Sequence, residues 1–167
     1  MGMDKWTLWH IGLSVKNMEE SIAHFKSLGG TTTDDNPGRV LDSTNFKDFK
    51  TYGKTDAPPW KIKIKMVQLG PLGLELTENV EGDNFNGTWM EEHGEGANHI
   101  AFQVDELEKE VDELIAKGVP AMYHAKGAYA YMDARKIGSG LVIELFQKRT
   151  RPPGPPPQGG AAPPQGR

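Results

Sequence analysis

The sequence predicts an α+β fold made of two tandem β-α-β-β-β modules. The main observation is an internal repeat. The segment HIGLSVKNMEESIAHFKSLG, which begins at His10, is matched without a gap by HIAFQVDELEKEVDELIAKG, which begins at His99. In each copy a strand-like alternation of apolar residues is followed by apolar residues at helical spacing, and further strand-like segments come after it. Because this whole pattern occurs twice, we expect two modules of the same kind.

The segment that opens each module is expected to be a strand with one apolar face. Odd-numbered residues are apolar in residues 9–15, and even-numbered residues are apolar in residues 100–104. Side chains alternate between the two faces of a strand. His10 and His99 therefore share the opposite face, away from the side that packs on the helices.

An amphipathic helix is expected after each of these strands. Apolar residues at i, i+4 and i+7 begin at Met18 in the first module and at Leu107 in the second. A side chain that can cap a helix precedes each run, and a glycine that can end a helix follows it. The expected caps and end residues are Asn17, Asp105, Gly29 and Gly118.

The remaining strands complete each module. The first module has strand-like residues 60–69 and 72–78, and the second has residues 120–124, 128–133 and 141–147. The first module also carries an insertion between Gly30 and Pro59, which is polar and rich in turn residues. An insertion of this kind is expected to form a loop over a site or an elaboration of a sheet edge.

We expect one folded domain over residues 1–148, with its modules at about 4–80 and 96–148. Residues 149–167 are rich in proline and glycine and lack large apolar side chains, so we expect a disordered tail. Such a tail is either a solubilising extension or, because RPPGPPP resembles polyproline ligands, a docking peptide for an aromatic groove.

Composition excludes several classes of function. The chain has 167 residues and a formal net charge of -4, which gives no reason to expect a nucleic-acid partner. It has no cysteine, so disulfides, thiolate catalysis and cysteine-ligated metals are excluded. The N-terminal residues lack the apolar run of a signal peptide, and no apolar stretch is long enough to span a membrane. We therefore expect a cytoplasmic protein that does not bind a membrane.

The last strand-like segment of each module carries a glutamate that is set among leucines and isoleucines, Glu75 in LGLELTE and Glu144 in GLVIELF. If the apolar neighbours pack on the helices, both carboxylates share the uncovered face with the two histidines. Buried carboxylates are costly unless positive charge lies near them. We therefore expect one divalent metal ion, which with nitrogen and oxygen ligands could be zinc, cobalt, nickel, manganese or iron. Its ligands would be His10, Glu75, His99 and Glu144.

This arrangement resembles the vicinal oxygen chelate superfamily over nearly the whole folded part of the chain. The segments EEHGEGANHIAFQVDELEKEVDELIAKGV and AYAYMDARKIGSGLVIELFQ are most similar to the branch that contains methylmalonyl-CoA epimerase and the glyoxalase-related proteins. The resemblance implies a cup-shaped, partly closed mixed sheet with helices outside. It also implies that the cup surrounds one divalent metal, which His10, Glu75, His99 and Glu144 bind.

The resemblance implies an isomerase, epimerase or lyase that enolises a small carbonyl substrate by proton abstraction. A ligand glutamate can serve as the base in such enzymes, so Glu144 and secondarily Glu75 are the expected catalytic residues. A role like that of methylmalonyl-CoA epimerase is expected first and a lactoylglutathione lyase of the glyoxalase I type second. Two further alternatives come after these: an extradiol-type iron dioxygenase and a ligand-sequestering resistance protein. The fourth expected ligand, Glu75, argues against the dioxygenase.

Two departures from the epimerase branch affect this assignment. Epimerases with two bases are expected to carry a further glutamate on the early strands, but this chain has none between Glu20 and Glu75. In addition, the branch often has glutamine where this chain has Glu75, whereas bacterial-type glyoxalase I has glutamate. An isomerase or lyase that uses a single base is therefore an alternative to two-base epimerisation.

Cationic residues suggest an anionic small-molecule substrate. If Ile62, Ile64 and Met66 pack under the helix, the lysines between them turn toward the cup. The alternative is a solvated edge strand that its lysines protect against aggregation. The expected substrate contacts are Lys61, Lys63, Lys65, Tyr131 and Arg135. We also expect a homodimer.

Overall fold

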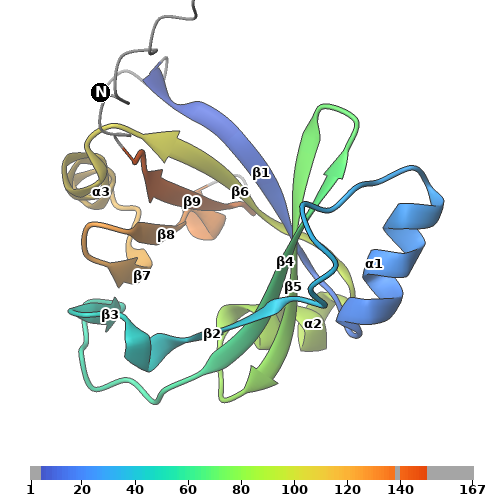
Figure 1. The fold of residues 1–167 in the computed structure, drawn as a ribbon. Coiled ribbons are helices and arrows are strands. Elements are labelled where there is room, and N and C mark those ends of the chain that lie inside the picture. The colour runs from blue at the N-terminus through green and yellow to red at the C-terminus, as the bar shows by residue number, and fades with distance from the viewer. Residues whose placement is uncertain (1–4, 138–139, 150–167) are drawn as a thin grey trace, which may run out of the picture.

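The computed structural model describes residues 5–137 and 140–149 (Figure 1). Nine strands form one sheet, and three α-helices accompany it, which confirms the predicted α+β class. The predicted disordered tail lies outside the described residues, except for Arg149. No helix in the described ranges has the length and apolar character that crossing a bilayer requires.

The first half of the chain contains the first module and its insertion. Asn17 caps α1 as predicted, because its side chain accepts hydrogen bonds from the N–H groups of Glu19 and Glu20. Gly29 follows the helix with a φ of 92°, a conformation that favours glycine. The elements are β1 (Thr7–Ser14), α1 (Met18–Ser27), β2 (Arg39–Asp42), β3 (Phe49–Thr51), β4 (Lys61–Leu69) and β5 (Leu72–Glu81).

The second half follows a connecting helix, α2 (Phe85–His93), and has one strand fewer than the first half, which carries the insertion. The predicted cap at Asp105 is wrong, since α3 begins after Glu106 with no side-chain cap. Instead, the N–H of Leu107 donates to the side chain of Gln147 on the last strand, at 3.0 Å. The elements are β6 (Gly96–Val104), α3 (Leu107–Ala116), β7 (Ala121–Ala125), β8 (Tyr129–Asp133) and β9 (Val142–Gln147).

The sheet places the two modules side by side, in the strand order β2-β4-β5-β1-β6-β9-β8-β7-β3. The opening strands β1 and β6 are antiparallel neighbours at its centre, and Gly12 lies opposite His99. The last strand of each module, β5 or β9, runs parallel to the opening strand of its own module. The centre of the sheet is therefore built from the four strands that carry the predicted metal ligands.

The insertion joins the two edges of the sheet. β2 lies at one edge and β3 at the other, although only residues 43–48 separate them. Such a segment spans at most about 25 Å, so the sheet must curl until its edges come close. Figure 1 shows this curled sheet, with the β2–β3 segment bridging its open side. Of the two roles expected for the insertion, edge elaboration is therefore confirmed for both edges.

The helices α1 and α3 pack on the outer face of the cup (Figure 1). Met18 of α1 is fully buried against Val67 and Leu76. Leu107 of α3 is fully buried in a second cluster, which includes Leu145 of β9. The glutamate neighbours on β5 and β9 thus face the helices as predicted, and the inner face of the cup is left for other side chains.

The predicted faces of β4 are wrong. Ile62 belongs to the apolar cluster inside the cup, and Ile64 packs against that cluster. Lys63 points to the other side, where its Nζ pairs with Glu19 of α1 at 3.3 Å. The prediction failed because it assumed that apolar faces pack only on helices, whereas the bridged cup encloses an apolar interior of its own.

Candidate metal centre

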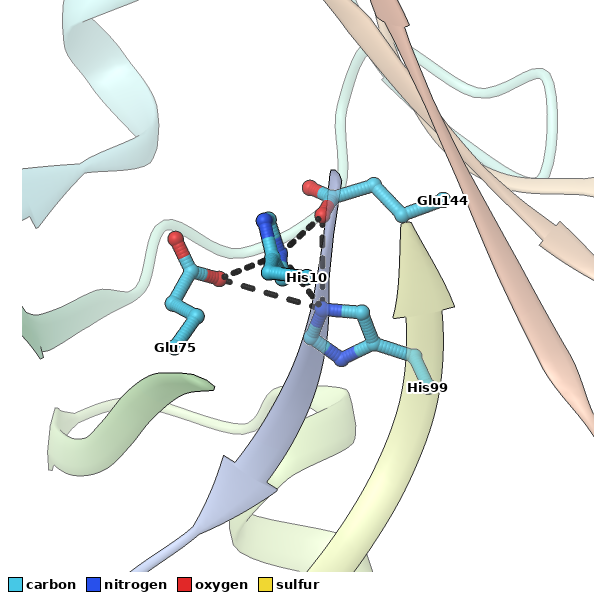
Figure 2. A group of neighbouring side chains, drawn as sticks. All are labelled: His10, Glu75, His99 and Glu144. Carbon is cyan, nitrogen blue, oxygen red and sulfur yellow. Dashed lines mark hydrogen bonds and ion pairs between the residues drawn. The ribbon is translucent and has the colours of Figure 1, made fainter. Parts of the chain in front are cut away.

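Four adjacent strands bring the predicted ligands together. β5, β1, β6 and β9 are consecutive in the sheet, and each contributes one side chain to its inner face. One ligand atom from each residue lies within 4.8 Å of the others. Figure 2 shows the two imidazoles and two carboxylates pointing toward one another. The residues are His10, Glu75, His99 and Glu144.

The distances from the two histidines to the other ligand atoms of this group are close to those around a small cation. Nε2 of His10 lies 3.6 Å from Oε2 of Glu75 and 3.1 Å from Oε2 of Glu144. For Nε2 of His99 the same two distances are 3.8 and 3.3 Å, and the two Nε2 atoms are 3.4 Å apart. Ligands at about 2.1 Å from a tetrahedral metal lie roughly 3.4 Å from one another.

The group is almost sealed from solvent. The histidine side chains are 0% exposed, while the Glu75 and Glu144 side chains are 10% and 3% exposed. Burial raises the pKa of Glu75, and the nearby Glu144 adds to that rise. For Glu144, burial also acts to raise the pKa, but hydrogen bonds with both histidines outweigh it and the pKa is lowered. Two buried carboxylates that depend on imidazole protons for compensation are a donor set that fits a divalent cation.

Metal binding should weaken as the pH falls. Burial acts to lower the pKa of His10, but the hydrogen bond with Glu144 and the charge of Glu75 raise it more. The raised pKa values of His10 and Glu75 mean that both hold protons at higher pH than free side chains do. Those protons must leave when a cation binds, so lowering the pH from 8 to 6 should reduce Zn²⁺ affinity. Calorimetric titrations at several pH values measure this, and an affinity independent of pH would contradict the assigned ligands.

Gly12 makes the space that the His99 ring occupies. A Cβ at Gly12 would lie 1.7 Å from Cε1 of His99 and 2.3 Å from its Nε2. Gly12 sits opposite His99 in the antiparallel β1–β6 pair, which brings the backbone of β1 against the ring. Any larger residue would displace the ligand. No local sequence pattern signals this role, because it depends on the pairing register of two distant segments.

A buried polar network fixes the orientation of His99. Oδ1 of Asn98 lies 2.6 Å from Nδ1 of His99, and Nδ2 of Asn98 donates to Ser14 at 2.6 Å and to Asn86 at 2.9 Å. With its amide nitrogen donating to these two oxygens, Asn98 presents Oδ1 as an acceptor for a proton on Nδ1. Nε2 of His99 is then free to bind a cation. Nδ1 of His10 has no such partner among the described residues.

Asn98 was not predicted from the sequence, although a signal existed. It falls on the otherwise apolar even-numbered face of β6 and is 3% exposed. A buried polar residue on an apolar face needs partners, and a position next to a ligand suggests which ones.

Replacement of Asn98 by leucine should weaken metal binding about 10- to 100-fold, because the tautomer and angle of His99 are no longer fixed. Asn98→Asp keeps an acceptor for Nδ1 and should lose less. Metal titration by calorimetry gives the affinities, and urea unfolding of the metal-free variants separates this effect from a loss of stability. Equal metal affinity in Asn98→Leu and the unchanged protein would contradict the role.

A cavity of about 790 Å³ opens above the metal group. Glu75 and Glu144 line it, so their carboxylates form its floor. Residues from the insertion, including Asp34, Leu41 and Phe46, contribute to its wall. The insertion therefore also borders the site, which agrees with its other expected role, a loop over a site.

The other predicted site residues divide into two groups. Tyr131 and Lys65 line the cavity, and the Tyr131 hydroxyl lies 3.5 Å from Nε2 of His99. Burial raises the pKa of Tyr131 well above its ordinary value, and the charge of Glu144 adds to the rise. Lys65 reaches the cavity although it shares the outer face of β4, and its Nζ pairs with Asp34 at 2.5 Å.

Three predicted substrate contacts do not line the cavity. Lys61 pairs with Glu81 at 2.7 Å, and Lys63 pairs with α1 because of the reversed faces of β4. Arg135 donates two hydrogen bonds to Asp133, both at 2.8 Å, and its guanidinium lies over the Phe85 ring. Arg135, which follows β8, thus contacts β8 through Asp133 and α2 through Phe85.

Comparison with known proteins agrees with this architecture. Residues 9–138 match the family model described as the Glyoxalase/Bleomycin resistance protein/Dioxygenase superfamily. No curated protein sequence matches the chain.

Several solved structures have a similar fold. A hypothetical protein from Bacillus halodurans is 22% identical, with a TM-score of 0.61 over 88% of this chain and 97% of its own. Methylmalonyl-CoA epimerase from Mycobacterium tuberculosis is 16% identical, with a TM-score of 0.60 over 86% and 88%. A variant of the Streptomyces coelicolor methylmalonyl-CoA epimerase, in complex with 2-nitronate-propionyl-CoA, is 17% identical, with a TM-score of 0.56 over 85% and 97%.

Proposed function

The chain belongs to the glyoxalase, bleomycin resistance protein and dioxygenase superfamily, also called vicinal oxygen chelate, and we propose that it is a metal-dependent isomerase or lyase. Its reaction would remove a proton from the carbon next to a substrate carbonyl. One observation carries the proposal: in a buried group of two histidines and two glutamates, the two glutamates line a cavity large enough for a small molecule.

His10 and His99 would hold the cation from below, and the carboxylates would complete the site. A divalent cation, when bound, polarises a carbonyl and stabilises the negative charge that develops on its oxygen. Glu144 is the proposed proton acceptor, because it lines the cavity and neighbours Tyr131 in the β8–β9 pair. The raised pKa of Tyr131 keeps its hydroxyl protonated at neutral pH, so it can donate a hydrogen bond to a substrate oxygen.

The cavity offers no third carboxylate placed to act as a second base. Its acidic lining residues, in the ranges that the structure describes, are Asp34, Glu75 and Glu144, and Asp34 pairs with Lys65. The lining residues that β2 contributes are Arg39 and Leu41, and neither is a carboxylate. Epimerisation would therefore require Glu75 to act with Glu144, whereas a lyase reaction of the glyoxalase I type needs one base. An acyl-CoA epimerase-like reaction is the first candidate, and the glyoxalase-like reaction is the second.

Charge near the cavity supports an anionic substrate. Arg39, Lys65, Lys148 and Arg149 all line it. Lys65 and Lys148 have acidic partners, but Arg39 has no ion-pair partner within the described part of the chain. An unpaired guanidinium at a cavity favours a carboxylate or phosphate group on the ligand.

Proton exchange in deuterated water tests the proposal. Metal-loaded protein is given methylmalonyl-CoA in one assay and the methylglyoxal–glutathione adduct in another, and deuterium incorporation and product are followed by NMR. Exchange at the carbon next to the carbonyl with the first compound supports the epimerase-like reaction, and conversion of the second supports the glyoxalase-like reaction. Absence of both, with the metal retained, would contradict these two candidates.

A further inference from the structure

The cavity above the metal group has an aromatic wall. Of the 6 phenylalanines, 4 tryptophans and 4 tyrosines in the chain, half line this one cavity. Tyr129 is central among them: its ring lies 5.2 Å from Phe46, 5.6 Å from Phe146 and 6.0 Å from Tyr131. The second module supplies most of this wall, through β7, β8 and β9.

The first module supplies an aliphatic wall to the same cavity. Ile62, Ile64 and Met66 of β4 line it together with Leu41 of β2. In the sheet, β5 with Glu75 and β9 with Glu144 lie between β4 and β8. The aromatic side chains are not confined to the second module, because Trp9, Phe46 and Trp60 of the first module also line the cavity. The space above the proposed ligands is therefore bounded by aromatic side chains from both modules and, along β4 and β2, by branched or flexible aliphatic side chains.

We infer that the substrate carries an aromatic ring next to the oxygens that bind at the metal group. This inference rests on the proposed function, because it places the ring directly above the proposed ligands. A flat ring exposes two apolar faces and a polarised edge. The edge suits contact with the aromatic wall, and aromatic pairs contribute beyond the area they bury. The aliphatic wall can cover one ring face.

A matched ligand series tests the inference separately from catalysis. The three compounds are 2-hydroxy-2-phenylpropanoate, its cyclohexyl counterpart and 2-hydroxy-2-methylpropanoate. All three share one chelating hydroxy acid, and none has a proton on the carbon next to the carboxylate, so binding is measured without turnover. Calorimetry is carried out on Zn²⁺-loaded protein, with loading checked by elemental analysis, and on metal-free protein.

The phenyl compound should bind about 50-fold more tightly than the methyl compound, from burial of the larger side group. It should bind about 3-fold or more tightly than the cyclohexyl compound, from ring–ring contacts. Tyr129→Leu should abolish the preference for phenyl over cyclohexyl. Tyr129→Phe keeps the ring and should keep the preference, as should Trp89→Leu, which removes an aromatic residue that does not line the cavity.

The possible failures are distinguishable. Equal affinity for the phenyl and cyclohexyl compounds, or a preference that survives Tyr129→Leu, would overturn the aromatic substrate. Binding of none of the three to loaded protein would also overturn it, while leaving the metal centre intact. Failure to load Zn²⁺ would instead contradict the proposed function, and the ratios in metal-free protein would still report on the ring.

Discussion

Replacing Glu144 by glutamine is expected to lower proton exchange by about 1000-fold, within the range that loss of a positioned base produces. Glutamine has nearly the same shape and keeps one carbonyl oxygen for the cation, but it cannot accept the proton. Metal content should fall less than activity does. The rate of deuterium incorporation, measured by NMR at equal metal loading, gives the effect.

Two matched substitutions complete this experiment. Glu75→Gln makes the same change on the other carboxylate of the floor and should cost less activity if Glu144 is the main base. Glu91→Gln changes an exposed residue of α2 and should leave the rate unchanged. If Glu144→Gln exchanges protons as fast as the unchanged protein, the base is another group.

Gly12→Ala should abolish metal binding and destabilise the fold. The added methyl group overlaps the His99 ring, so either the ring or the β1 backbone must move. Overpacking of this kind costs about 1–3 kcal/mol, and a displaced ligand should weaken Zn²⁺ affinity by more than about 100-fold. Urea unfolding and metal titration measure the two effects.

A double-mutant cycle identifies the cause. In the His99→Ala background the ring is absent, so adding Gly12→Ala should cost little further stability. Strong coupling between the two substitutions is the expected result. If Gly12→Ala is equally destabilising in both backgrounds, the cost comes from the backbone of β1 and not from the ligand ring.

The ligand group could be predicted because the chain repeats itself. Matching strands in two modules put His10 beside His99 and each glutamate on the same side, and this requires only the alternation of side chains along a strand. The structure confirms the group as a buried cluster that could hold a metal. Its metal and its substrate stay proposals, and the homodimer stays a prediction.

The parts that could not be predicted depend on contacts between distant segments. Gly12 and Asn98 act on His99 through strand register and a buried network that reaches α2. The prediction for the faces of β4 was wrong because β3 pairs with β7, and the bridging segment then encloses an apolar interior. Each of these features depends on how the edges of the sheet meet, which local patterns do not encode.

Metal stoichiometry is the direct test of the four-ligand site. The protein is stripped with a chelator, dialysed against Zn²⁺ and then against metal-free buffer, and its metal content is measured by elemental analysis beside His99→Ala and Glu75→Gln. About one Zn²⁺ per chain is expected in the unchanged protein, as for one four-ligand site, with a large loss in His99→Ala and a smaller loss in Glu75→Gln, because glutamine keeps one oxygen for the cation. Unchanged metal content in both variants, or no retained metal in the unchanged protein, would contradict it.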